Sequence, residues 1–242
     1  MKTLIVGAAF LSLCAAFMAG CSQSTAGKGE DWTHLFDGKT LDGWVQRGGK
    51  AKYTVSDGVI VGETVLNTPN SFLCTEKEYA DFILEVEFLV DDTLNSGIQI
   101  RSESKPDYQN GRVHGYQVEI DPSTKPYDKE PKNLLANGQP APPDESRSWS
   151  GGIYGEGKRG WLFNLTKNAA ARKAFKHGQW NLYRVEAVGD TIKTWVNGVP
   201  AADFKDKPEE LVPKGFIALQ VHGSSTAGLQ IMWRNVRIKV LD

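Results

Sequence analysis

The chain has 242 residues, of which 40% are hydrophobic and 24% charged, and its mean hydropathy is −0.37. This composition is typical of a globular protein and excludes a wholly disordered chain, a coiled coil and a polytopic membrane protein. The net charge of −1, from 28 Lys and Arg against 29 Asp and Glu, creates no long-range field that would favour nucleic acid as a partner. Three cysteines are too few for a disulfide framework.

The first twenty residues resemble the signal peptide of a bacterial lipoprotein. A lysine at position 2 precedes an apolar stretch, 4–17, that is too short to span a bilayer as a mature helix. Residues 18–21, Met-Ala-Gly-Cys, resemble a lipobox, in which Cys21 would be lipidated; ordinary secretory cleavage nearby is the alternative, because Met is less usual than Leu at the first position. We expect a signal peptide over 1–20, a flexible tether over 21–31, and an outer-membrane lipoprotein that faces the periplasm.

From Trp32 onward no linker divides the chain, so we expect a single domain over 32–242. Alternation of apolar and polar residues predicts strands over residues 82–90, 98–101, 116–121, 182–187, 191–196 and 217–222. Residues 168–175 predict a short surface helix, and residues 123–150 predict a long loop, a feature that is usually functional in a compact domain. The pattern indicates an all-β fold, an antiparallel two-sheet β-sandwich with one face left for a ligand.

Three of the expected strands carry uncommon polar residues at spacing two, which places each pair on one side of its strand. The pairs are Gln99 with Arg101, Gln117 with Glu119, and Gln220 with His222. One interpretation is an ordinary solvated sheet face. We favour a binding face, because solvated faces are richer in Lys, Glu and Thr, whereas amide, guanidinium and imidazole groups suit ligands rich in hydroxyl groups.

Aromatic residues near the Gly-rich segment 151–155 support a sugar ligand, since sugar C–H faces stack on aromatic rings. Tyr154 and Trp161 are the proposed stacking residues. The four histidines show no metal-ligand spacing, although a mixed site that uses Glu119 and His222 stays open. No pair of carboxylates on one strand is suited to ordinary retaining hydrolysis, because Ser and Thr follow Glu119 at the positions where a second Glu would be needed.

Several motifs together resemble the 3-keto-disaccharide hydrolase family, over about residues 32–240. They are WTHLFDGKTLDGW at 32–44, NSGI at 95–98, GYQVEI at 115–120, LQVHG at 219–223 and WRNVRI at 233–238. The resemblance implies a jelly-roll sandwich of the concanavalin A-like lectin/glucanase type and action on glycosides already oxidised at C3. The C3 carbonyl acidifies the C2 hydrogen, so that a base forms an enolate, the C1 substituent leaves, and water adds to the product.

This chemistry requires a base, a group that stabilises the enolate oxygen, and an acid near the leaving group. Glu119 or His222 would be the base, and Arg101 would stabilise the oxyanion. Glu63, just after residues 59–62, is a second candidate acid or base, or simply a solvated carboxylate. The expected substrate-binding residues are Asn95, Gln99, Gln117, Tyr154, Trp161 and Gln220.

The expected partners are a 3-keto oligosaccharide or glucoside and, through lipidated Cys21, a membrane; nucleic acid is not expected. A divalent cation could assist the enolate, although no residue spacing requires one. The alternative function is a non-catalytic carbohydrate-binding lipoprotein of the envelope on the same sandwich, because a fold does not determine a function.

Overall fold

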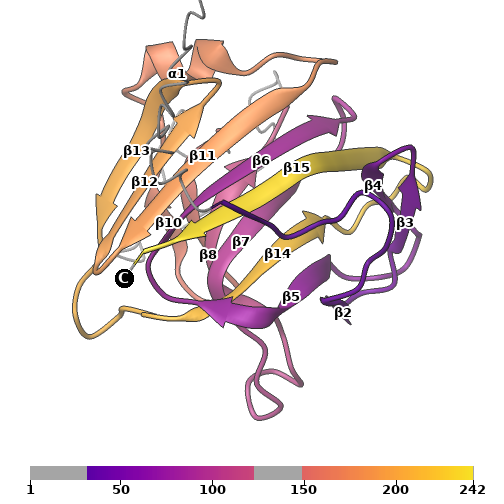
Figure 1. The fold of residues 1–242 in the computed structure, drawn as a ribbon, viewed down its shortest axis with the longest axis horizontal. Helices are drawn as coiled ribbons and strands as arrows, with labels where there is room; N and C mark the ends of the chain where they lie inside the picture. Colours follow the sequence, from indigo (N-terminus) through magenta and orange to yellow (C-terminus); the bar gives the residue numbers. More distant parts are fainter. Residues whose placement is uncertain (1–31, 123–148, 242) are drawn as a thin grey trace, which may run out of the picture. The chain divides into compact units, whose positions relative to one another are not determined.

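The computed structural model describes residues 32–122 and 149–241, which form two antiparallel β-sheets packed face to face (Figure 1). The expected signal peptide, Cys21, the tether and nearly all of the expected long loop lie outside the described residues. The all-β sandwich predicted from the alternating pattern is confirmed.

The first sheet has eight strands and contains most of the long runs of alternating residues. In spatial order its strands are β13 (Val199–Lys205), β12 (Thr191–Val196), β11 (Asn181–Val188), β6 (Phe82–Val90), β15 (Gln230–Val240), β4 (Val59–Glu63) and β3 (Lys52–Ser56), and β1 (Thr33–His34) pairs with β15. The bounds of β6 and β12 match their predicted ranges.

The second sheet has seven strands and carries the polar pairs singled out above. In spatial order its strands are β10 (Gly160–Phe163), β9 (Ile153–Glu156), β8 (His114–Ile120), β7 (Ser96–Glu103), β14 (Gly215–Val221), β5 (Ser71–Tyr79) and β2 (Trp44–Gly48). Strand β14 therefore lies between β5 and β7, which are far from it in the sequence. This crossover brings the polar residues of β14 beside those of β7 and β8.

The hydrophobic core lies between the two sheets, because each contributes the apolar half of its alternating strands. In β6 every second side chain is buried, from Phe82 to Val90, while Glu85 and Glu87 point outward. In the opposing sheet Ile98, Val118 and Leu219 fill the same core. Deleting such a side chain would cost about 2–5 kcal/mol.

The one helix in the described part of the chain is α1 (Ala169–Ala174), where a short helix was predicted. The side chain of Asn168 accepts a hydrogen bond from the N–H of Ala171 and caps its first turn. Within the described residues, no helix has the length and apolar character that a membrane span requires.

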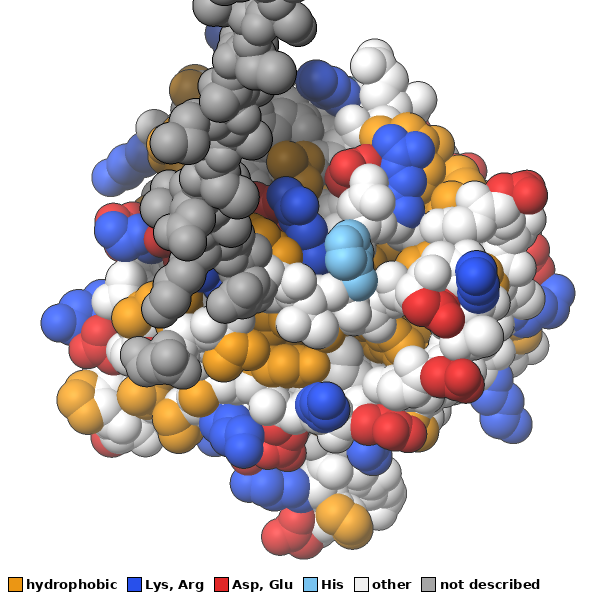
Figure 2. Space-filling view, viewed as in Figure 1, with side chains coloured by type: hydrophobic (Ala, Val, Ile, Leu, Met, Phe, Trp, Pro, Cys, Tyr) orange, Lys and Arg blue, Asp and Glu red, His pale blue; other side chains and the backbone are white. Residues whose placement is uncertain are grey.

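The outer face of the eight-stranded sheet is turned toward the viewer in Figure 1, and Figure 2 shows acidic, basic and apolar side chains mixed over it. Arg184 and Arg237 both bind Glu85, and Arg234 binds Glu87. The charged groups named here are therefore paired with one another on this face.

Candidate active site

The outer face of the seven-stranded sheet gathers polar side chains from three adjacent strands. Gln99 of β7 lies directly opposite Gln117 of β8, and Gly97 lies opposite both Glu119 of β8 and Gln220 of β14. Directly opposed residues of an antiparallel pair project to the same side of the sheet. The expected pairing of these amides and Glu119 on one face is therefore present.

A chain of hydrogen bonds between side chains ends at the Glu119 carboxylate. The amide nitrogens of Asn95 and Gln117 donate to its two oxygens at 2.6 and 2.8 Å. The amide nitrogen of Gln99 donates to the Gln117 oxygen at 2.5 Å, and the Ser102 hydroxyl donates to the Gln99 oxygen at 2.8 Å. Asn95 and Gln117 thus direct their N–H groups at Glu119, and Gln99 holds the Gln117 amide in this orientation.

Burial gives Glu119 unusual acid–base properties. The residue is only 4% exposed, and its burial raises the pKa to about 8, with a further contribution from the nearby carboxylates of Asp121 and Glu156. The hydrogen bonds from Asn95 and Gln117 oppose this rise in the pKa, because they stabilise the charged form. A carboxyl group with a pKa near the working pH can both accept and return a proton, as general acid–base catalysis requires.

A second buried carboxyl group, Glu156 at the end of β9, lies near Glu119 and was not among the predicted site residues. It is 7% exposed, and burial raises its pKa against the lowering effects of Arg112, whose guanidinium lies 3.7 Å away, and of His222. Glu156 follows Tyr154 at spacing two, the same signal that identified the other pairs. The signal was missed because β9 is only four residues long and contains a glycine.

His222 directly follows β14 and is exposed, and it lies near enough to Glu156 to lower the pKa of that carboxyl group. Its Nδ1 lies 2.7 Å from the carbonyl oxygen of Gly223, so Nδ1 carries the hydrogen and donates it. In the neutral imidazole the lone pair is then on Nε2. His222 therefore belongs to the same site and has a basic nitrogen available.

Gln220 is fully buried, and among the described residues neither its amide nitrogen nor its amide oxygen has a hydrogen-bond partner. A buried polar group without a partner costs about 1–3 kcal/mol, so such groups normally mark a place for a ligand or an ordered water. Gln220 lies between Phe72 of β5 and Gly97 of β7. It therefore stands at the border between an apolar cluster, to which Phe72 belongs, and the hydrogen-bonded polar side chains around Glu119.

A cavity of about 570 Å³ adjoins this border. It lies between the loop that joins β7 to β8, residues 104–113, and the segment that joins β4 to β5, residues 64–70. Phe72 and Val113 form an apolar floor, and Asn70, Arg112 and Glu156 add polar groups to the wall. The volume falls within the roughly 300–1,000 Å³ typical of small-molecule sites.

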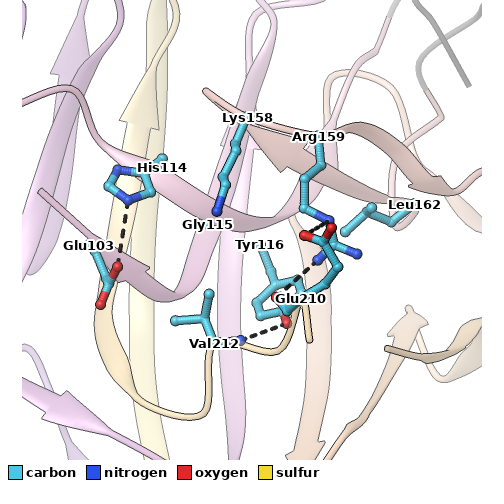
Figure 3. A pocket seen from close by; sticks show the side chains of 9 residues that line it. All are labelled: Glu103, His114, Gly115, Tyr116, Lys158, Arg159, Leu162, Glu210 and Val212. Carbon is cyan, nitrogen blue, oxygen red and sulfur yellow. Dashed lines mark hydrogen bonds and ion pairs between the residues drawn. The ribbon is translucent and has the colours of Figure 1, made fainter. Parts of the chain in front are cut away.

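Figure 3 shows a second, much smaller cavity, of about 40 Å³, which Tyr116 of β8 lines. Tyr116 and Glu119 are three residues apart in the strand and so project to opposite sides of β8. The hydroxyl of Tyr116 donates to Asp206 at 2.5 Å, and Arg159 binds both oxygens of the same carboxylate. His114 reaches Glu103 at 3.5 Å. Since its main polar groups are already paired and it has room for only a few waters, this cavity is not the substrate site.

Arg101 does not join the site, in contrast to its expected role as the oxyanion group. A β-bulge between Ile100 and Glu103 interrupts the alternation, and Arg101 has a positive φ of 44°. Its fully buried guanidinium donates to the carbonyl oxygens of Ala80 and Gly189 and pairs with Asp81 at 2.7 Å. The bulge turns the side chain toward the turns at the end of the other sheet.

Glu63 and Trp161 also differ from their expected roles. Glu63 belongs to the eight-stranded sheet, where hydrogen bonds from Lys52, at 2.7 Å, and Gln230 lower the pKa of its carboxyl group. Trp161 is only 3% exposed and packs edge-on against Tyr154 at 5.3 Å, so its ring face is not open to a sugar. Tyr154, which is half-buried and paired with Gln117, remains available for stacking.

Among residues 32–122 and 149–241, no three His, Cys, Asp or Glu side chains are grouped closely enough to hold a metal ion. Cys74 is the free cysteine of this part of the chain, and burial raises its pKa to about 12. It packs in the apolar half of the outer face with Phe72 and Ala218 and has no nucleophilic role at neutral pH.

Comparisons with known proteins agree with this architecture. The model of the 3-keto-alpha-glucoside-1,2-lyase-like domain matches residues 31–239. Two candidate glycosyl hydrolases of Parabacteroides distasonis are each 22% identical to the chain; one alignment covers 87% of this chain and 94% of the other with a TM-score of 0.60, and the second covers 87% and 99% with a TM-score of 0.56.

A protein of unknown function with a galectin-like fold from Bacillus subtilis is 10% identical, over 82% of this chain and 90% of that one, with a TM-score of 0.55. At these identities the three structures indicate the fold alone. The search of curated proteins finds no match.

Proposed function

The chain belongs to the family of 3-keto-alpha-glucoside-1,2-lyase-like domains, and from this premise we propose that it cleaves 3-keto-glycosides by elimination followed by addition of water. Membership in this family supports a function in which the protein acts on carbohydrates. The observation that carries the specific proposal is the buried Glu119, whose carboxyl group is held by Asn95 and Gln117 and has a pKa of about 8. A purely binding face needs no such group.

In the proposed reaction, Glu119 removes the proton from C2, and the electron pair of the C–H bond passes into the C3 carbonyl to form an enolate. The enolate then collapses: the C3 carbonyl re-forms, a double bond forms between C1 and C2, and the bond from C1 to the leaving oxygen breaks. That oxygen leaves with a proton from an acid. Water finally adds its hydroxyl group to C1 and its hydrogen to C2, which completes net hydrolysis.

The remaining roles follow from the positions of the neighbouring groups. The Gln220 amide, which lacks a partner among the described residues, is available to bind a substrate oxygen. Tyr154 presents its half-buried ring beside Gln117. His222, with its lone pair on Nε2, is the alternative base, and the variant below discriminates between the two.

The test is turnover of 3-ketotrehalose, followed by the ultraviolet absorbance of the transient enone, with unoxidised trehalose as the substrate control. Glu119→Gln keeps the size of the side chain and one of its two hydrogen-bond acceptors but removes its acid–base function, and we expect a loss of about 10²–10⁴-fold in kcat. Glu63→Gln, the same change on the other sheet, is the matched control and should retain the wild-type rate. Saturable sugar binding without product would support the non-catalytic alternative instead.

We also propose that the protein is anchored through lipidated Cys21 in the outer membrane, facing the periplasm. The lipobox-like residues 18–21 support this localisation. The mass of the mature N-terminal peptide from envelope fractions tests it: a lipid-modified Cys21 is expected, and an unmodified N-terminus nearby would indicate secretory cleavage.

A further inference from the structure

We propose that the cavity between residues 64–70 and 104–113 is the subsite for the leaving group of the glycoside, and that Glu156 in its wall donates the proton to the departing oxygen. This inference rests on the proposed function and extends it. The occupant is the C1 substituent, a sugar or another ring that has an apolar face and bears hydroxyl groups.

The position of Glu156 is the first argument. Its carboxyl group acts electrostatically on Glu119, and it also lines the cavity beside Arg112. A keto-sugar that presents its C2 hydrogen to Glu119 has the adjacent C1 substituent within reach of a neighbouring group. Glu156 is therefore close enough to Glu119 to affect its pKa and also lines the cavity that would hold the substituent.

The chemistry of the lining is the second argument. Phe72 and Val113 are 3% and 1% exposed and belong to a small apolar cluster on this face, which suits the C–H face of a ring. Arg112 supplies donors for hydroxyl groups, and Asn70, whose amide oxygen accepts from the N–H of Gly223 at 3.0 Å, adds a second polar side chain. At the border with the Glu119 site, the buried amide of Gln220 has no partner among the described residues and lies beside Phe72 in the sheet.

The outer wall of the cavity is held by hydrogen bonds, and a preformed subsite binds its ligand at a lower cost in conformational entropy. The hydroxyl of Tyr108 donates to the carbonyl oxygen of Gly157 at 2.7 Å, and its ring packs at a tilt against that of His114, with 4.1 Å between the ring centroids. The hydroxyl of Ser104 closes the loop by donating to the Gly111 carbonyl at 2.6 Å. Loop 104–113 is thus tied to β8 and to the turn after β9.

The proton transfer from Glu156 completes the elimination described above. As the bond between C1 and the leaving oxygen breaks, that oxygen takes the electron pair and the proton of Glu156, which becomes a carboxylate. Burial raises the pKa of Glu156, which favours the protonated form that an acid needs at the start of the step. Arg112, at 3.7 Å, stabilises the carboxylate that the transfer produces.

Gln109→Trp tests the cavity, because residue 109 lines it and the indole takes up more of its volume. The positive φ of 44° at this position strains a bulky side chain, so Tm is measured alongside to confirm that the variant is folded. The readout is the ratio of kcat/KM for 3-ketotrehalose, which has a sugar leaving group, to that for methyl 3-keto-α-glucoside. We expect this ratio to fall by about tenfold or more, which is about 1.4 kcal/mol of lost recognition. Asp107→Trp, on the same loop but outside the lining, should leave the ratio unchanged. An unchanged ratio in Gln109→Trp would overturn the subsite.

Glu156→Gln tests the proton transfer. A sugar alkoxide needs an acid to leave, whereas 4-nitrophenolate does not, so the loss of kcat for 3-ketotrehalose should exceed that for 4-nitrophenyl 3-keto-α-glucoside by about hundredfold. Equal losses for both substrates refute the acid role. If the wild-type protein turns over neither substrate, the proposed function fails. If it turns over both substrates and the variants show none of these differences, only the leaving-group subsite fails.

Discussion

Arg101→Met is the sharpest test of the distinction between a catalytic and a structural arginine. The guanidinium is fully buried and donates at 2.7 and 2.6 Å to the carbonyl oxygens of Ala80 and Gly189, and it pairs with Asp81 at 2.7 Å. Methionine preserves the apolar length of the side chain but leaves three acceptors without their donor. Removing one partner of such a buried arrangement typically costs about 3–5 kcal/mol. In a domain of this size that corresponds to a fall in Tm of roughly 6–20 °C.

The assay is thermal and urea unfolding, together with kcat/KM for a 3-keto-glucoside measured well below the unfolding temperature. Arg184→Met is the control. Like Arg101, Arg184 makes three hydrogen bonds, here to acidic side chains, but its side chain is 34% exposed, so the substitution should lower the free energy of unfolding by at most about 1 kcal/mol. We expect Arg101→Met to lower stability strongly and kcat/KM little. Unchanged stability with a large loss of kcat/KM would refute the structural assignment and support the role first expected for Arg101, stabilisation of the enolate oxygen.

Two further predictions concern the surroundings of Glu119. Because a base acts in its deprotonated form, kcat/KM of the wild type should rise with pH through an apparent pKa near 8. Asn95→Ala removes a hydrogen bond that lowers the pKa of Glu119, so the rise should move to higher pH in this variant. A pH profile of Asn95→Ala identical to that of the wild type would exclude Glu119 as the titrating base. Gly97→Ala would place a Cβ 2.5 Å from the Gln117 side chain, so the Gln117 amide must leave the position from which it donates to Glu119. The expected results are a loss of about tenfold or more in kcat and a lower Tm, because displacing the buried hydrogen-bonded amide costs about 1–3 kcal/mol; full activity would show that Gln117 does not need this position.

The sequence by itself predicts most of the sandwich, because burial of one face imposes a period of two on each strand. The same period placed Gln99, Gln117, Glu119 and Gln220 on outward faces, where the structure has them. It could not show that these faces adjoin, because β14 reaches β7 only through the crossover that inserts it beside β5.

The tertiary structure decided three features that no local pattern carries. The bulge after Ile100 breaks the period of two and removes Arg101 from the site, where strict alternation had placed it. The short strand β9 brings Glu156 beside the site, although its four residues are too few for a periodic signal. The depth of Glu119 sets its pKa, because desolvation depends on everything that packs around the carboxyl group and not on its neighbours in the chain. Periodicity therefore determined which residues face outward, and packing determined which of them meet and how they ionise.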